Sequence, residues 1–259
     1  MSIRSILFRK HYLVKRTKHK DEKLVHDTPV SFLTPLPQMN PLISINEQSH
    51  APIIYGDRPA MAEFNVDHAL RQLDNEHYVV FRDLIIPSGV KSLPLTQIDH
   101  VVISIYGIFC IETKSNNGSV YGFTTSEHWK QYLGRQQYGM YNPYRQNEYH
   151  AKSLENLLHG MIKAPIHSYI AFPNAYKVIV DGKLCDMSIH GIMNKINQHT
   201  RPVYDLSSVE RIAKTLAYAA SKREELRPYH IAEVRKHVES KISHSLKVNH
   251  TVSKFKLRS

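Results

Sequence analysis

The chain has 259 residues, of which 42% are hydrophobic and 22% charged, with 10 Gly and 13 Pro. This composition excludes a chain that is disordered throughout and a fibrous repeat, and the length allows one large domain or two small ones. Cys110 and Cys185 are too few for a disulfide framework or a four-thiolate zinc site. No stretch approaches the about 18 consecutive apolar residues of a membrane span, so we expect a cytoplasmic protein without stable membrane insertion.

The net charge of +11 is distributed unevenly. Lys and Arg outnumber Asp and Glu by 8 to 2 in residues 1–23 and by 13 to 6 in residues 201–259, whereas residues 56–200 hold 13 of each. Basic ends around a neutral middle predict sequence-independent attraction to a polyanion, although they could also serve only solubility. We therefore expect a basic N-terminal segment with a Pro-rich linker or strap at 1–55, a folded core at 56–200 and a basic helical extension at 201–259.

The first half of the core alternates between helix and strand patterns. From Pro59, apolar residues recur at helical spacing, which predicts a helix with Glu63 at the edge of its apolar stripe. Residues 78–86 are rich in β-branched and aromatic side chains and predict a strand. Residues 97–104 and 107–113 predict two further strands that form a hairpin.

The second half adds helices and two short strands. An amphipathic helix is expected after a boundary at Asn142-Pro143, and residues 168–172 and 176–180 are typical of strands. Ser207, followed three residues later by a glutamate, has the spacing of a capping box that opens a helix. Pro228 is expected to be the first residue of the last helix. The order of elements indicates a mixed α/β or α+β fold, of which we expect the mixed α/β.

The hairpin is the most informative segment. A turn at residues 105–106 would place Asp99 opposite Glu112 and Gln97 opposite Lys114, with all four polar side chains on one face. The other face would then carry the apolar residues Ile98, Val102, Phe109 and Ile111.

Two carboxylates at directly opposed positions repel each other, because their β-carbons are only about 4.5 to 5.5 Å apart. A divalent cation that prefers oxygen ligands, such as Mg²⁺, would offset this repulsion, and Lys114 could then assist chemistry at a phosphate. The alternative is structural: Asp99 and Glu112 could lie on an exposed strand face on which Lys114 neutralises one of them.

Residues 97–102 and 107–114 resemble the nuclease-related domain (NERD) family, which is similar to the PD-(D/E)xK nucleases. The helix start at 56–63, residues 142–150 and residues 170–174 agree with this resemblance in order. The resemblance implies a restriction-endonuclease-like core, in which helices flank a central mixed sheet, followed by basic C-terminal helices.

The resemblance also implies a site, in which Asp99 and Glu112 are metal-binding carboxylates and Lys114 is the catalytic lysine. Glu63 would approach the same metal, and the backbone carbonyl of Thr113 would be a further ligand. Gln97 and Gln146 would support the substrate phosphate or the attacking water. The implied cofactor is Mg²⁺, with Mn²⁺ as a second option.

Smaller signals add to this view. His150 follows Gln146 by four residues on the same helical face, so we expect it near the site. Trp129 is expected to anchor the core, and Cys110 to be a small buried apolar residue. Six cations of the C-terminal region are expected either to contact phosphates or to form a charged solvent face: Lys222, Arg223, Arg227, Arg235, Lys236 and Lys241.

Two function classes follow. The first is a metal-dependent nuclease that hydrolyses DNA in processing, repair or defence against foreign DNA. The second is a non-catalytic DNA-binding or assembly module of nuclease fold that works with a helicase or another protein partner. RNA is a further candidate substrate, because phosphate contacts do not read the sugar.

Overall fold

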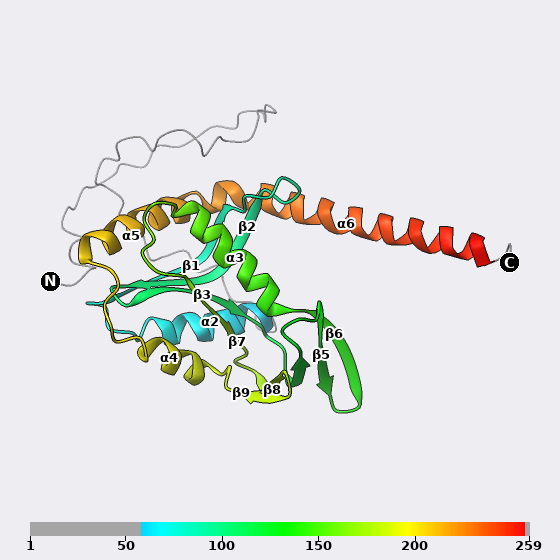
Figure 1. Ribbon diagram of the computed structural model, residues 1–259, viewed down its shortest axis with the longest axis horizontal. Helices are drawn as coiled ribbons and strands as arrows, with labels where there is room; N and C mark the ends of the chain where they lie inside the picture. Colours follow the sequence, from blue (N-terminus) through cyan, green and yellow to red (C-terminus); the bar gives the residue numbers. More distant parts are fainter. Residues whose placement is uncertain (1–57, 257–259) are drawn as a thin grey trace, which may run out of the picture.

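The computed structural model describes residues 58–256, with side chains described through residue 240. The strap expected at 1–55 and the side chain of Lys241 lie outside the described part. Within residues 58–256 there are five helices and nine strands. Their arrangement is a mixed α/β fold, as the sequence predicts, with C-terminal helices (Figure 1).

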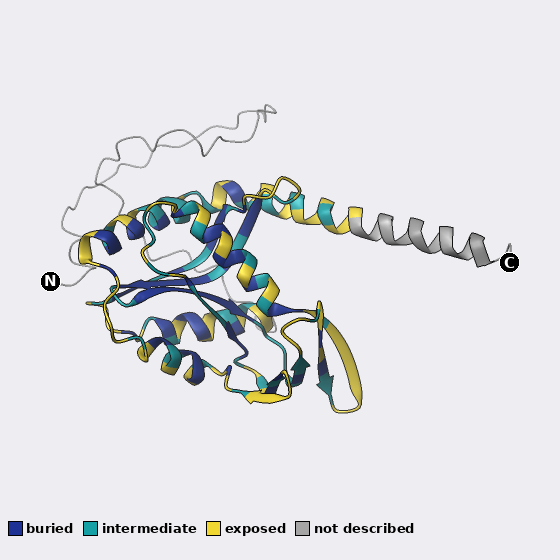
Figure 2. Cartoon of the chain, in the orientation of Figure 1, coloured by how far each residue is buried: buried dark blue, intermediate teal, exposed yellow. Residues whose placement is uncertain are grey.

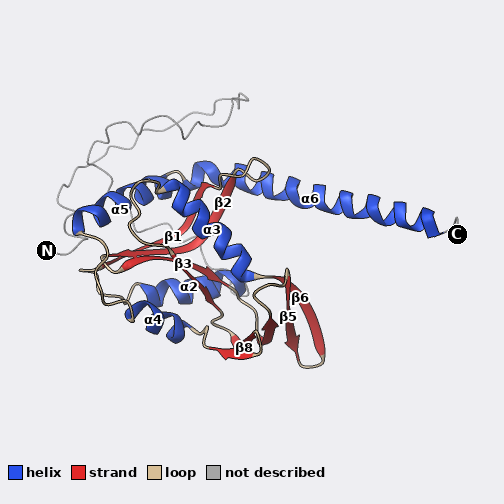
Figure 3. Ribbon diagram, viewed as in Figure 1, coloured by secondary structure: helices blue, strands red, loops and turns tan. Residues whose placement is uncertain are grey.

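A four-stranded sheet forms the centre of the molecule, in the order β1-β2-β3-β7. Its first three strands are antiparallel and β7 runs parallel to β3, so the sheet is mixed, as expected. Helices α2 and α4 lie on one face and α3 and α5 on the other (Figures 1 and 3). The bounds are β1 Tyr78–Pro87, β2 Leu95–Ser104, β3 Gly107–Thr113, β7 His167–Ala171, α2 Arg58–Leu70, α3 Pro143–Leu157, α4 Ile189–Asn197 and α5 Leu206–Ser221.

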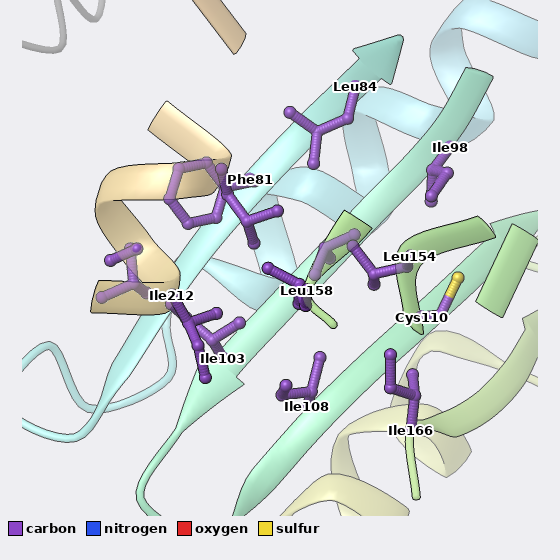
Figure 4. Close-up of a cluster of buried hydrophobic side chains, with 14 of the residues drawn as sticks. Phe81, Leu84, Ile98, Ile103, Ile108, Cys110, Leu154, Leu158, Ile166 and Ile212 are labelled. Atoms are coloured by element: carbon purple, nitrogen blue, oxygen red, sulfur yellow. The ribbon is translucent and has the colours of Figure 1, made fainter. Parts of the chain in front are cut away.

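Two apolar clusters hold these layers together. On one face, Leu154 and Leu158 at the end of α3 and Ile212 of α5 pack against Ile103 and Ile108 of the hairpin (Figure 4). On the other face, helices α2 and α4 pack on the sheet through Val66, Leu70, Ile192 and Ile196. Because α5 shares a cluster with α3 and the hairpin, α5 packs directly on the central sheet.

The hairpin has the predicted register. Ser104 pairs with Gly107 and His100 with Ile111, so the turn lies at residues 105–106. One expectation is wrong: Ile98 packs in the cluster of Ile103 rather than on the opposite face. The reason lies in strands β1 and β2, where Asp83 is placed opposite Asp99 and has a φ of 52°. At this position the alternation of side chains between the two faces of the sheet shifts by one residue in both strands.

A second, five-stranded sheet was not predicted in full. Its order is β6-β5-β4-β8-β9, and it projects beside α3 (Figure 1). Trp129 of β5 is 1% exposed and lies in the core of this sheet, as expected. Gly122 accommodates it, because a Cβ at that position would lie 2.2 Å from the indole ring. The bounds are β4 Gly118–Gly122, β5 His128–Leu133, β6 Gln136–Tyr141, β8 Ala175–Val180 and β9 Lys183–Cys185.

The C-terminal helices differ from the sequence prediction at their starts. The N-cap of α5 is Asp205, which accepts the Ser208 amide, so the capping box expected at Ser207 is wrong. The last helix, α6, spans Arg223–Lys256 and contains Pro228 instead of beginning there. Leu226, upstream of the proline, packs on Ile85 and Leu95 and thereby fixes the early start.

Burial follows the layers. The central sheet is buried between its helices, whereas strand β6 and residues 229–240 of α6 are mostly exposed (Figure 2). Among the helices of residues 58–256, none is long and apolar enough to cross a membrane.

Candidate active site

Glu112 is the centre of a buried polar cluster at the end of β3. Its side chain is 4% exposed, and both of its oxygens have contacts. Lys114 Nζ donates to Oε1 at 2.6 Å and Gln146 Nε2 donates to the same oxygen at 2.8 Å. His150 Nε2 lies 3.3 Å from Oε2. Burial favours the neutral acid, but His150 and Lys114 outweigh it and hold the pKa of Glu112 below its usual value.

Lys114 is held by two oxygens and by the backbone. Besides the bond to Glu112, Nζ donates to Gln146 Oε1 at 2.8 Å. The backbone N–H of Lys114 donates to the carbonyl of Ala171 on β7, which continues the pairing of β3 with β7 by one residue. The side chain is 20% exposed, so the ammonium group is fixed in position yet remains accessible.

Helix α3 supplies Gln146 and His150. Asn142 caps its N-terminus by accepting the Tyr144 amide, and Pro143 occupies the first turn. Gln146 and His150 are four residues apart and therefore lie on the same helical face. Thr96 of β2 bonds to His150 Nδ1 at 2.8 Å, which leaves Nε2 toward Glu112. The expectation that His150 lies near the site is confirmed.

Asn147 fixes α3 to the sheet. It is fully buried, and its Nδ2 donates to the carbonyl of Cys110 at 3.0 Å, to Ser168 Oγ at 2.8 Å and to the carbonyl of Tyr169 at 2.9 Å. Cys110, also buried as expected, donates its thiol to Asn147 Oδ1. Asn147 thus joins α3 to β3 and β7, which sets the position of the neighbouring Gln146.

Asp99 lies at the junction of the hairpin and α2. Its Oδ2 accepts the backbone N–H of Thr113 at 2.8 Å. Burial, followed by the negative charges of Glu112 and Glu63, raises the pKa of Asp99 well above its usual value. The charges of Glu112 and Glu63 thus act on Asp99, and Lys114 is the cation that partly offsets them.

The donor chemistry of these residues fits a divalent cation. Carboxylate oxygens are the ligands that Mg²⁺ prefers, and the mutual repulsion at Asp99 is of the kind that such a cation relieves. As arranged, however, the described residues contain no group of three or more His, Cys, Asp or Glu side chains that could hold a metal ion. Glu112 is instead engaged with Lys114, Gln146 and His150.

Gln97 is placed differently from the prediction. We expected Gln97 to lie opposite Lys114 across the hairpin. Instead, its Nε2 donates to Asp83 Oδ1 at 2.8 Å, on the side of β2 toward β1. Asp83 Oδ2 in turn accepts Arg227 Nη2 of α6 at 2.5 Å. Gln97 therefore belongs to a link between β2 and α6 that borders the site.

Several C-terminal cations have carboxylate partners within the chain. Arg227 is bonded to Asp83, and Arg223, with a side chain 16% exposed, lies 3.7 Å from the same carboxylate. Lys222 pairs with Glu225 at 2.8 Å, and Lys236 lies 3.9 Å from Glu233. Arg235 is exposed. The two arginines nearest the sheet thus anchor α6, and phosphate contact by these cations remains a prediction.

Two site-defining residues were missed by the sequence reading. Asn147 was visible only as part of the family-like stretch at 142–150, because a single polar residue in an amphipathic helix gives no sign of burial. Asp83 gave a stronger signal, since it is a carboxylate within a mostly apolar strand. Its positive φ and its arginine partners come from tertiary structure and are not visible in the sequence.

Comparison with known proteins places the site within a known family of domains. The family model described as nuclease-related domain (NERD) matches residues 58–173. An uncharacterized protein of Bacillus anthracis is 34% identical over 107 residues, which are 41% of this chain and 49% of that protein. The chain thus spans about half the length of this curated relative. No solved structure matches significantly. The resemblance seen in the hairpin is confirmed, and residues 58–173 of this chain form a nuclease-related domain of the NERD family.

Proposed function

We propose that this chain is a metal-dependent nuclease that hydrolyses phosphodiester bonds of DNA, with its active site at the Glu112 end of strand β3. The observation that carries the proposal is the convergence of Asp99, Glu112 and Lys114 within the matched domain. A fold alone would not need a buried Asp99, whose ionised form is destabilised by Glu112 and Glu63, beside an ordered Lys114. Such an arrangement lowers stability and is typical of sites shaped for chemistry.

Lys114 is assigned to the reacting phosphate. Its ammonium group is preorganised by Glu112 and Gln146, so it can stabilise the negative charge that develops in the transition state without first being reoriented. Gln146 positions Lys114 and, through its Nε2, also fixes Glu112. His150 Nε2 lies 3.3 Å from the second oxygen of Glu112.

Asp99, Glu112, Glu63 and the carbonyl of Thr113 are the groups that would hold Mg²⁺, or Mn²⁺ in its place. When bound, the cation would act as a Lewis acid toward the phosphate and favour deprotonation of the attacking water. The bond from the Thr113 amide already fixes the carboxylate of Asp99 for such a role. Gln97 is hydrogen-bonded to Asp83, and we assign it the role of holding β2 in place beside Asp99.

The alternative is a non-catalytic DNA-binding or assembly module that works with a helicase or another partner. Arg223 and Arg227 are paired with Asp83 and hold α6 in place, so the domain could serve to position this helix for a partner. Such a module would not need an ordered Lys114 between Glu112 and Gln146.

The test is to incubate the purified full chain with labelled single-stranded, duplex and branched DNA, in Mg²⁺, in Mn²⁺ and in chelator. We expect cleavage that requires metal and that falls at least about 100-fold in Lys114→Ala. Circular dichroism and DNA binding in chelator serve as controls for folding. Binding without cleavage on every substrate would favour the non-catalytic module, and cleavage unchanged in Lys114→Ala would reject the site.

A further inference from the structure

The outer face of the five-stranded sheet is not used by the proposed chemistry. Strand pairing places Tyr121 opposite Lys130, and His128 opposite Tyr141, on the side of the sheet away from Trp129. Val120 and Val178, which alternate with these positions, point with Trp129 into the core. We call this surface the tyrosine-lysine face and define it by Tyr121, His128, Lys130, Tyr132, Tyr141 and Lys177.

The rings of this face are arranged in pairs across neighbouring strands. Tyr121 and Tyr132 are 5.4 Å apart at 88°, and His128 and Tyr141 are 6.0 Å apart at 81°. Because both pairs meet edge to face, the rings do not cover one another as stacked rings would. Tyr141 is 47% exposed, so a flat ligand can reach it.

The charge of the face is positive. Lys130 is exposed, and Lys177 Nζ lies 5.6 Å from the ring centroid of Tyr121. None of the five strands of this sheet contains an Asp or Glu. Tyrosines and lysines without carboxylates suit a polyanion that presents flat aromatic groups, which is the chemistry of a nucleic acid with unstacked bases. A duplex keeps its base faces inside its own stack, so the complementary form is a single strand.

The face continues into the proposed active site from two directions. Strand β4 begins at Gly118, four residues after Lys114, so the two residues are at most about 14 Å apart. Tyr141 directly precedes Asn142, the cap of the helix that carries Gln146. These two short connections keep the face within reach of the groups assigned to the phosphate, so that one DNA single strand can contact both.

We infer that the tyrosine-lysine face binds a single-stranded segment of DNA beside the phosphodiester that is cut. This inference rests on the proposed function, for which it supplies a substrate class. The chain's own residues 1–23 are a poor occupant, because their eight Lys and Arg repel Lys130 and Lys177.

The test is fluorescence anisotropy of a labelled oligothymidylate with the full chain, in chelator so that no cleavage occurs. Tyr141→Ala is expected to weaken binding at least about fivefold, since one stacked base is lost. Tyr138→Ala is the matched control: this tyrosine is 46% exposed on the same strand but on the opposite face, and its loss should leave the affinity unchanged. Lys130→Gln should reduce the slope of log K against log salt by about 0.7.

Equal effects of the two tyrosine variants, or no effect of either, would overturn the inference. It would also be overturned by tighter binding of duplex DNA or of oligouridylate than of oligothymidylate. The nuclease proposal can fail separately. If the wild type does not cleave DNA but Tyr141→Ala still weakens binding, the face binds single-stranded DNA and the nuclease proposal is wrong. If Lys114→Ala abolishes cleavage and Tyr141→Ala binds normally, the site stands and the face does not.

Discussion

Strand β3 buries polar groups in opposite ways at its two ends. At its start, Phe109 stacks on His167 of β7 at 5.2 Å, and His199 joins through a bond to Tyr169 at 2.9 Å, so this end is a cluster of rings. At its other end, Glu112 and Lys114 form a charged pair joined by the side-chain amide of Gln146 on α3. The ring end buries groups that can all be neutral, whereas the charged end buries Asp99, whose ionised form is destabilised by burial and by the neighbouring carboxylates. This difference supports the proposal that the charged end serves chemistry and the ring end the fold.

The strongest test of this contrast is at Asn147, between the two ends. Asn147→Ala removes a fully buried side chain with hydrogen bonds to three residues of β3 and β7, so it should lower the free energy of unfolding by about 2–4 kcal/mol. Urea unfolding measures the loss. Asn156→Ala, at an exposed position of the same helix, should cost less than about 0.5 kcal/mol. Equal costs would show that α3 is not held through Asn147.

A smaller effect is expected where α6 is anchored beside the site. Arg227→Ala breaks a 2.5 Å bond to Asp83, and because both side chains are partly exposed, we expect a loss of about 1 kcal/mol in the free energy of unfolding. The comparison variant is Lys222→Ala, whose more exposed pair with Glu225 should contribute about 0.3 kcal/mol. If the two variants are equally stable, the anchor assigned to Asp83 is wrong.

The smallest effect concerns pH and the ring end. Burial, followed by the charge of His199, lowers the pKa of His167 below 6.5. A histidine with a lowered pKa stays neutral in the folded chain while the unfolded chain takes up a proton. Stability is therefore retained above pH 6.5 and declines as pH falls below it. The decline between pH 7 and 5 should be shallower in His167→Gln than in wild type, and unchanged in the exposed-site control His159→Gln. A steeper decline in His167→Gln would contradict this account.

The sequence predicted the parts of the site that depend on local pattern. The hairpin was correct in register because a two-residue turn at 105–106 and the alternation on either side of it are local features. The boundary at Asn142-Pro143 and the position of His150 were likewise predicted from local signals, a proline at the helix start and a spacing of four residues. Gln97 was misplaced because the positive φ of Asp83, on a different strand, changes the alternation of β2.

Tertiary packing explains the other differences. Strands such as β6, with the sequence QQYGMY, lack an apolar alternation and exist through their pairing with β5. Helix α6 begins before Pro228 because Leu226, Arg223 and Arg227 bind it to β1 and β2. Asn147 depends on the meeting of β3, β7 and α3, which no single segment of the sequence specifies.

The most direct test of the central claim is the rate of DNA cleavage in Mg²⁺ by Asp99→Asn compared with wild type. This isosteric variant keeps an acceptor for the Thr113 amide and removes one of three mutually repelling charges, so it should fold at least as stably as wild type. The account predicts that wild type cleaves and that Asp99→Asn loses cleavage by at least about 100-fold. Equal cleavage rates in a folded Asp99→Asn variant would contradict the claim that the charged end of β3 is an active site.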